Sequence, residues 1–182
     1  MKKIAVLLTI LTLAACSVVK DTWNNANLFP VSEDIKLGGQ VYNEIMSNKA
    51  EYPTVPEAGN EELYSYVRGI TKKIINNGNV RYATEFPWKV TLINNEKVQN
   101  AFATPGGYIF VYTGLIKFLD SEDQLAGVMG HEIAHAANRH STRQLTKIMG
   151  VSILLDAALG KKETVKDVTA SIVGLSFSRD HE

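Results

Sequence analysis

Apolar residues recur every three or four positions over residues 61–76, and this spacing predicts an amphipathic helix that ends at Gly78. The apolar side chains on its predicted buried face are Leu63, Val67, Ile70 and Ile74. A looser helical spacing follows Ser32, which we expect to cap an earlier helix with acidic residues in its first turn. Residues 47–60 contain two prolines and a glycine and predict a loop between the two helices.

The period then shortens to that of β-strands. Residues 88–93, 101–104 and 108–112 are short runs rich in β-branched and aromatic side chains. Residues 105–107, with the sequence Pro-Gly-Gly, separate the last two runs and predict a hairpin. We therefore expect a small antiparallel sheet, followed by one or two helical turns at residues 115–119.

Helical patterns return in the second half of the chain. Ser121 with Gln124 three residues later is a capping box, which predicts the start of a long helix. Apolar residues between 145 and 155 predict a further helical stretch, and a last helix is expected from residue 164 onward. The pattern as a whole predicts an α+β fold, with helices packed on a small sheet, in one domain over residues 28–182.

The first sixteen residues differ in character from the rest. Two lysines precede an apolar run over residues 4–15, which is too short to cross a bilayer, since a spanning helix needs about 20 residues. The run suits the hydrophobic part of a secretory signal, and its ending in Leu-Ala-Ala before Cys16 resembles a bacterial lipobox. We therefore expect an exported lipoprotein with a signal peptide at 1–15, lipidation of Cys16 and a tether at 16–27. Ser17, in place of an acidic residue, favours the periplasmic face of the outer membrane over the inner membrane.

Composition adds two exclusions. The chain has 19 basic and 19 acidic residues and no basic block, so the charge pattern gives no reason to expect nucleic acid as a partner. Its single cysteine lies in the lipobox, so we expect no disulfide in the mature chain.

Residues 131–135 read His-Glu-Ile-Ala-His, and this H-E-x-x-H pattern carries the candidate chemistry. On a helix, residues four apart lie about 40° apart around the axis, so His131 and His135 project from one face. Two imidazoles in that arrangement can hold one Zn²⁺, with Glu132 beside them as general base for a zinc-bound water. We therefore expect His131 and His135 as metal ligands, Glu132 as the catalytic base and one zinc ion per chain as the cofactor.

Two histidines leave a catalytic zinc site incomplete, and the sequence offers more than one source for the remaining ligand. His140 would lie about 180° from His131 on one continuous helix and would need a helix break to turn back. We therefore expect it to cap a helix or make a surface hydrogen bond rather than bind the metal. A carboxylate from a later helix is the other arrangement, and the segment 177–182 is placed to supply it.

Three blocks of sequence resemble successive motifs of one protein family. They are Asn-Ala-Phe-Ala-Thr-Pro-Gly-Gly from residue 100, Gly-His-Glu-Ile-Ala-His from residue 130 and Phe-Ser-Arg-Asp-His-Glu from residue 177. In this order they resemble the HtpX and CAAX-prenyl-protease family of zinc metallopeptidases, and most closely its soluble, exported lipoprotein branch of BepA-like and LoiP-like members. The resemblance extends from about residue 27 to the end of the chain and implies a zincin-like fold.

The resemblance also implies a third zinc ligand. In that family it is the first Glu of an E-x-x-x-D segment on a later helix, and the final block aligns this Glu with Glu182. Asp180 or His181 would take the role if the register slipped, and Glu182 could instead be a frayed terminus. The Asp expected four residues after Glu182 is absent, so we expect the chain to be a truncated member of the family.

Substrate handling is a further implication of the resemblance. The edge strand that would bind an extended peptide through its backbone comprises Asn100, Ala101, Phe102 and Ala103. The side chain of Phe102 is expected in the core. The expected function is a zinc metalloendopeptidase that hydrolyses unfolded or misassembled cell-envelope proteins in quality control, anchored to the membrane through Cys16. The rival expectation is a non-catalytic envelope chaperone or assembly factor that binds client proteins, which would have no use for Glu132 as a base.

Overall fold

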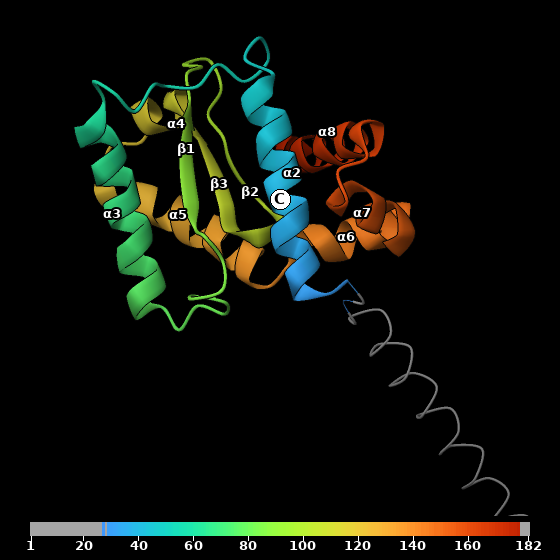
Figure 1. Cartoon of the computed structure of the whole chain (residues 1–182). Coiled ribbons are helices and arrows are strands. Elements are labelled where there is room, and N and C mark those ends of the chain that lie inside the picture. The colour runs from blue at the N-terminus through green and yellow to red at the C-terminus, as the bar shows by residue number, and fades with distance from the viewer. Residues whose placement is uncertain (1–26, 28, 179–182) are drawn as a thin grey trace, which may run out of the picture.

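The computed structural model describes residue 27 and residues 29–178 (Figure 1). The expected signal peptide, the lipobox with Cys16, nearly all of the tether, and Asp180, His181 and Glu182 lie outside the described residues. In chain order the elements are α2 (Val31–Ser47), α3 (Glu61–Asn77), β1 (Lys89–Ile93), β2 (Ala101–Thr104), the short 3-10 turn η1 (Pro105–Gly107), β3 (Tyr108–Tyr112), α4 (Thr113–Phe118), α5 (Glu122–Ala137), α6 (His140–Met149), α7 (Val151–Ala158) and α8 (Lys162–Ser178). Within this described part, no helix is both long and apolar enough to cross a membrane.

The sheet has three strands in the order β1-β3-β2. β2 and β3 form the predicted antiparallel hairpin across η1, with Phe102 opposite Phe110. The expectation of a wholly antiparallel sheet is wrong, because β1 pairs in parallel with β3. The loop after β1 passes the start of α4, where Gly114 N donates to Asn95 O at 3.1 Å. The chain then enters β2 on the far side of the position that β3 occupies in the sheet. Strand periodicity predicts which residues face the core, but not which strand becomes the neighbour.

Helices cover both faces of the sheet, and the alternation of side chains along the strands decides which helices they meet (Figure 1). One face packs against α2, α7 and α8, and the other packs against α3 and α5. The first face presents Phe102, Phe110 and Tyr112, and the second presents Ala101, Ala103, Ile109 and Val111. All seven are buried, which confirms the α+β class and the core role expected for Phe102.

The helix starts follow the sequence in one case and depart from it in another. Ser121 caps α5 as predicted, since its hydroxyl accepts a hydrogen bond from Gln124 N at 3.3 Å. α2 begins earlier than expected, with Pro30 rather than Ser32 as its N-cap. Pro30 O accepts a hydrogen bond from Asp34 N at 3.1 Å, so the proline closes the first turn and Ser32 lies inside the helix.

The loop between α2 and α3 covers the outer edge of β1. Thr54 forms an isolated antiparallel bridge with Ile93. Beside that bridge, Val55 N donates to Leu92 O at 3.0 Å. The sheet is thereby closed on the β1 side, and β2 remains as its edge strand.

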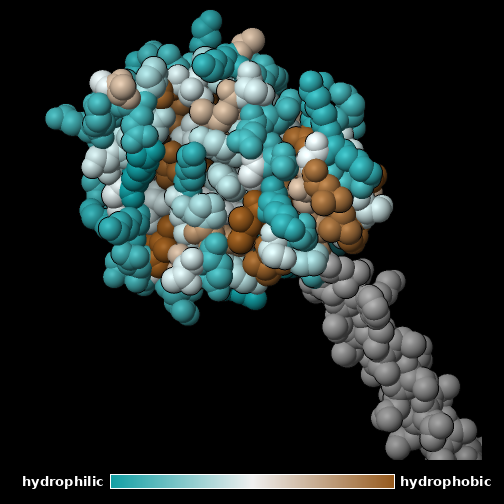
Figure 2. Space-filling model, viewed as in Figure 1, coloured by the Kyte–Doolittle hydropathy of each residue, from teal (hydrophilic) through white to brown (hydrophobic). Residues whose placement is uncertain are grey.

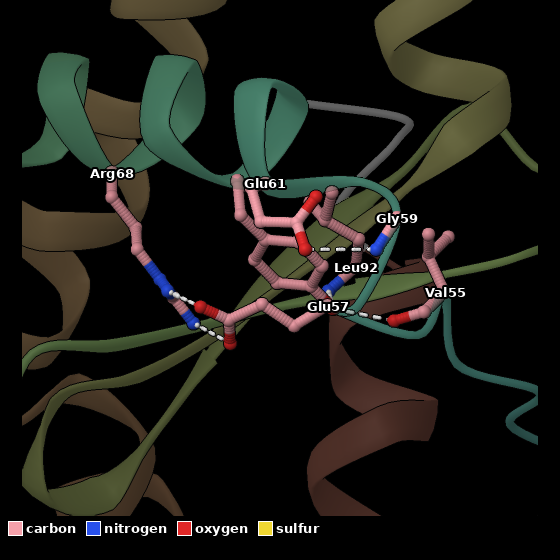
Figure 3. A network of polar contacts seen from close by, with 7 residues as sticks. Val55, Glu57, Gly59, Glu61, Arg68 and Leu92 are labelled. Atoms are coloured by element: carbon pink, nitrogen blue, oxygen red, sulfur yellow. Dashed lines mark hydrogen bonds and ion pairs between the residues drawn. The ribbon is translucent and has the colours of Figure 1, made fainter.

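Side chains of α3 hold this covering loop in place (Figure 3). Tyr64 Oη donates to Val55 O at 2.8 Å, and Arg68 forms a two-point ion pair with Glu57. The hydrogen bonds from Arg68 lower the pKa of the Glu57 carboxyl. Because both contacts come from α3, this helix holds the loop against the edge of β1.

α2 packs closely on the turn between β2 and β3. Gly106 and Gly107 have φ values of +75° and +82°, in the left-handed region that favours glycine. A Cβ on Gly38 would lie 1.9 Å from Pro105 O, so only glycine allows this approach of the helix to the turn. A Cβ on the next residue, Gly39, would lie at an ordinary contact distance of 3.5 Å from the nearest atom.

We expect Gly38→Ala to lower the free energy of unfolding by about 3 kcal/mol, because the added methyl group displaces the backbone of the turn. Gly39→Ala is the matched control. It should be neutral or stabilising by up to about 1 kcal/mol, because alanine is the better helix former. Urea unfolding followed by circular dichroism measures both variants, and equal free energies of unfolding would contradict the close contact at Gly38.

Candidate active site

α5 carries the two candidate metal ligands on one side. Met129 and Ile133, on its opposite side, are buried against the sheet and set the rotation of the helix. His131 and His135 project away from that core, and their Nε2 atoms lie 3.0 Å apart. The rings meet edge to face, with centroids 4.5 Å apart. The structure thus brings together the two imidazoles that the sequence singled out.

Glu132 is buried beside this pair. Its Oε2 accepts a hydrogen bond from Ala103 N at 3.0 Å. Since Ala103 belongs to β2, the backbone of the edge strand sets the orientation of the carboxylate. A carboxylate held in this way can accept a proton from a water molecule at the histidine pair.

β2 turns its outer edge toward this site. Tyr112 N donates to Asn100 O at 3.1 Å, so the alternate residue Phe102 also directs its backbone groups at β3. The N–H groups of Ala101 and Ala103 therefore point the other way. Ala101 N donates to Asn100 Oδ1 at 2.7 Å, and Ala103 N donates to the carboxylate described above. Of the four residues predicted for the edge, Ala101 and Ala103 direct their backbone N–H groups toward the site. The side chain of Phe102 lies in the core.

A cleft of about 330 Å³ lies between α5, β2 and α8. Its lining includes Asn100, Leu115, Gly127, His131, Glu132 and Ser176. Asn100 is only 7% exposed, and within the described part of the chain no hydrogen-bond partner reaches its Nδ2. A buried donor without a partner is costly, so a ligand that brings a carbonyl oxygen to Asn100 would be favoured in this cleft.

A helix break brings a third histidine to the site. α5 ends at Ala137, Arg139 has φ 56° and ψ 38°, and α6 begins with His140. His140 Nδ1 lies 3.0 Å from His135 Nδ1, and the ring centroids are 4.8 Å apart. The placement of His140 about 180° from His131 applied to one continuous helix, and the break turns the ring back toward His135 instead. His140 faces the nitrogen of His135 opposite Nε2, so it does not share the point at which His131 and His135 converge.

A buried polar network holds this break. Arg139 Nε donates to Asp34 Oδ2 at 2.5 Å, and Thr142 Oγ1 donates to Asp34 Oδ1 at 2.7 Å. Arg139 Nη2 also donates to Phe29 O. Burial raises the pKa of the Asp34 carboxyl, and the hydrogen bonds from Arg139 and Thr142 oppose that rise. The charged form of Asp34 therefore depends on its two partners near the break.

Sequence reasoning missed this network, although the sequence carries one signal for it. Asp34 precedes Leu37 by three residues and Val41 by seven, which places an acid on the apolar stripe of α2. A buried carboxylate needs a partner. The partners Arg139 and Thr142 lie 105 and 108 positions away, beyond the reach of any local pattern.

The donor atoms that the structure describes fit a zinc ion. Two imidazole nitrogens on a tetrahedral Zn²⁺, each at about 2.0–2.1 Å, would lie about 3.3 Å apart. The two Nε2 atoms are 3.0 Å apart, so a small shift of either ring accommodates the ion. No group of three potential metal ligands occurs among the described residues, and the three candidates Asp180, His181 and Glu182 lie outside them. α8, which precedes these candidates, reaches the cleft through Ser176.

Comparisons with known proteins give the family. The model of peptidase family M48 matches residues 62–179. Mitochondrial metalloendopeptidase OMA1 of Arabidopsis thaliana is 37% identical over 97 residues, which are 52% of this chain and 20% of that protein. OMA1 of Schizosaccharomyces pombe is 31% identical over 151 residues, 81% of this chain and 43% of that protein. The beta-barrel assembly-enhancing protease of Escherichia coli is 28% identical over 134 residues, 66% of this chain and 27% of that protein.

The matched regions bear on the candidate site. The chain spans less than half the length of each of these relatives. The family match covers most of the chain, including the edge strand β2 and the H-E-x-x-H helix α5. This supports the expectation of a peptide-bond hydrolase at the level of the family. The chain therefore belongs to peptidase family M48.

Proposed function

We propose that this chain is a zinc-dependent metalloendopeptidase of the cell envelope that takes part in protein quality control. The observation that carries the proposal is the convergence of His131 Nε2 and His135 Nε2 beside the buried carboxylate of Glu132, at the edge of β2. Membership of peptidase family M48 supports the reaction class. The names of the relatives, a metalloendopeptidase and a beta-barrel assembly-enhancing protease, support the kind of reaction and the kind of client.

The proposed chemistry divides between a metal and this chain's own groups. A bound Zn²⁺ supplies a Lewis acid, which lowers the pKa of its water and polarises a substrate carbonyl. His131 and His135 would hold the ion, with Glu182 as the proposed third ligand. Glu132 would accept a proton from the attacking water and deliver it to the leaving amine. The Ala103 N–H keeps that carboxylate oriented at 3.0 Å.

The proposed substrate path follows the outer edge of β2. An extended peptide would lie along the edge of β2 at Ala101 and Ala103, whose backbone groups point away from β3. Asn100 and Ala101 line the cleft at the start of this path. The buried Nδ2 of Asn100 has no hydrogen-bond partner among the described residues, and it would bond a peptide carbonyl once a rotation of the side chain exposed it to the cleft. Unfolded or misassembled envelope proteins are the proposed substrates, because an unfolded segment can take up the extended conformation that pairs with a strand edge.

The cellular setting of the proposal comes from the sequence. The apolar run before Cys16 supports export and lipid anchoring through that cysteine, with the outer membrane as the proposed site. The resemblance to BepA-like and LoiP-like members of the HtpX and CAAX-prenyl-protease group supports the same assignment. The balanced charge supports the absence of nucleic acid from the proposed partners.

A non-catalytic client-binding module is the second candidate function. Apolar surface gathers over α7 (Figure 2), and Ile153 and Leu159 are 37% and 73% exposed in this part of the chain. Such surface suits the apolar segments of an unfolded client. Glu132 separates the two functions, since binding alone has no use for a buried carboxylate beside two imidazoles.

Glu132→Gln should lower casein hydrolysis by about 10²–10⁴-fold, because the amide cannot accept the proton. Zinc should remain bound, since the Gln oxygen can still accept from Ala103 N. Glu122→Gln, in the exposed first turn of the same helix, is the control and should keep full activity. Activity assays and metal analysis measure the outcome. Unchanged hydrolysis by Glu132→Gln would exclude the proposed mechanism and favour the client-binding alternative.

Gly127→Leu should reduce hydrolysis of a peptide substrate by about tenfold or more, because the side chain fills the cleft beside His131. Gly130→Leu is the matched control, since Gly130 lies on α5 but lines a different pocket. In the described structure, no atom outside α5 lies within 4 Å of a Cβ built at either position. Both variants should therefore fold, and equal kcat/KM values would show that substrate does not use this cleft.

Three substitutions compare the candidates for the third ligand. Glu182→Ala should weaken zinc binding by about 100-fold or more, because it removes a ligand, whereas Asp180→Ala and His181→Ala should change it little. Competition with a chromophoric chelator gives the three affinities. A loss confined to Asp180→Ala or to His181→Ala would move the ligand to that residue.

A further inference from the structure

His140 is a feature of the site that the proposed function leaves without a role. The two ring nitrogens of His135 have different neighbours: Nε2 faces His131, and Nδ1 faces His140 Nδ1 at 3.0 Å. A hydrogen bond between two ring nitrogens needs one donor and one acceptor. If His135 binds a metal through Nε2, its proton is on Nδ1, so His135 donates and His140 accepts. Such an acceptor fixes the tautomer and the ring orientation of a metal-binding histidine.

The position of His140 is set by contacts on both sides of it in the chain. Asp34 Oδ2 accepts from Arg139, the residue before His140, and Asp34 Oδ1 accepts from Thr142, two residues after it. The side chains of Asp34 and Arg139 are only 1% and 10% exposed. One carboxylate on α2 therefore holds both ends of the short segment that presents His140 to His135.

The backbone at Arg139 shows that this arrangement is imposed from outside the segment. Its φ of 56° lies in the left-handed region, where glycine would be favoured. A glycine would adopt the same turn without strain, but it would lack the guanidinium that reaches Asp34 and Phe29 O. The guanidinium contacts therefore account for an arginine at a position where the backbone alone favours glycine.

We propose that Asp34, Arg139 and Thr142 form a positioning unit that seats His140 on His135 Nδ1 and so sets the orientation and tautomer of a metal ligand. This inference rests on the proposed function, because it takes His131 and His135 as the metal pair. None of the four residues donates to the metal in this scheme. Their effect on zinc binding passes through His135.

The first test changes the acceptor in the full chain. His140→Leu should weaken Zn²⁺ binding by about 10–100-fold, because His135 loses its hydrogen-bond acceptor. His140→Asn should restore the affinity to within about threefold of the unchanged protein, since the amide oxygen can take the place of Nδ1. Chelator competition gives the affinities, and the Co²⁺ absorption spectrum should shift with His140→Leu but not with His140→Asn. Circular dichroism of the metal-free proteins checks the fold.

The second test changes the unit that places His140. Arg139→Gly allows the same backbone turn but removes the guanidinium, and it should weaken Zn²⁺ binding about as much as His140→Leu does. The double variant should bind no more weakly than His140→Leu alone, because both changes act through one contact. Arg143→Ala, one turn further along α6, is the control and should keep the full affinity. Additive losses in the double variant would overturn the proposal.

The protonated ring nitrogens of His135 and His140 can also be identified in the unchanged protein, and this measurement does not depend on the folding of any variant. Long-range ¹H–¹⁵N correlation spectra of the zinc-loaded protein should show His135 protonated at Nδ1 and His140 protonated at Nε2. A proton on His140 Nδ1, or His140→Leu with unchanged Zn²⁺ affinity, would overturn the positioning role while leaving the proposed function in place. Failure of the unchanged protein to bind Zn²⁺ would overturn both proposals.

Discussion

The buried ion pair between Asp34 and Arg139 joins α2 to the end of α5, the H-E-x-x-H helix. Removing one partner of such a pair costs about 3–5 kcal/mol, because the other is left charged in an apolar medium. The left-handed backbone at Arg139 costs only about 1–2 kcal/mol. The pair is therefore strong enough to hold a helix break that the local backbone disfavours. Without that break α6 could not begin beside His135.

The turn of α2 that contains Asp34 also supports the part of the site that holds Glu132. A Cβ on Gly106 would lie 3.1 Å from Asp34 O, so α2 rests directly on the turn between β2 and β3. β2 in turn holds Glu132 through Ala103 N. Glu132 and the histidine pair are thus both positioned relative to α2, Glu132 through the hairpin and the histidines through the break. Close packing makes such an arrangement stiff, because neither contact leaves room for small displacements.

The parts of the structure that could be predicted are those with local causes. The aromatic and β-branched runs around Pro-Gly-Gly predicted the hairpin of β2 and β3, and the Ser121 capping box predicted the start of α5. The direction of β1 could not be predicted, because periodicity does not identify a strand's neighbour. The break at Arg139 had no glycine or proline to mark it. Its cause is a carboxylate 105 positions away, and only the placement of Asp34 on an apolar stripe hinted at a missing partner.

The covered edge of β1 has a consequence for any extended polypeptide that meets this domain. An exposed strand edge presents unpaired backbone N–H and C=O groups, with which a strand of another chain can pair. Here the loop bridged at Thr54 removes one of the two edges, and α3 keeps the loop there through Tyr64 and Arg68. Among the described residues, β2 is therefore the edge along which another chain can add to this sheet. The side on which it pairs is then also the side on which Glu132 lies.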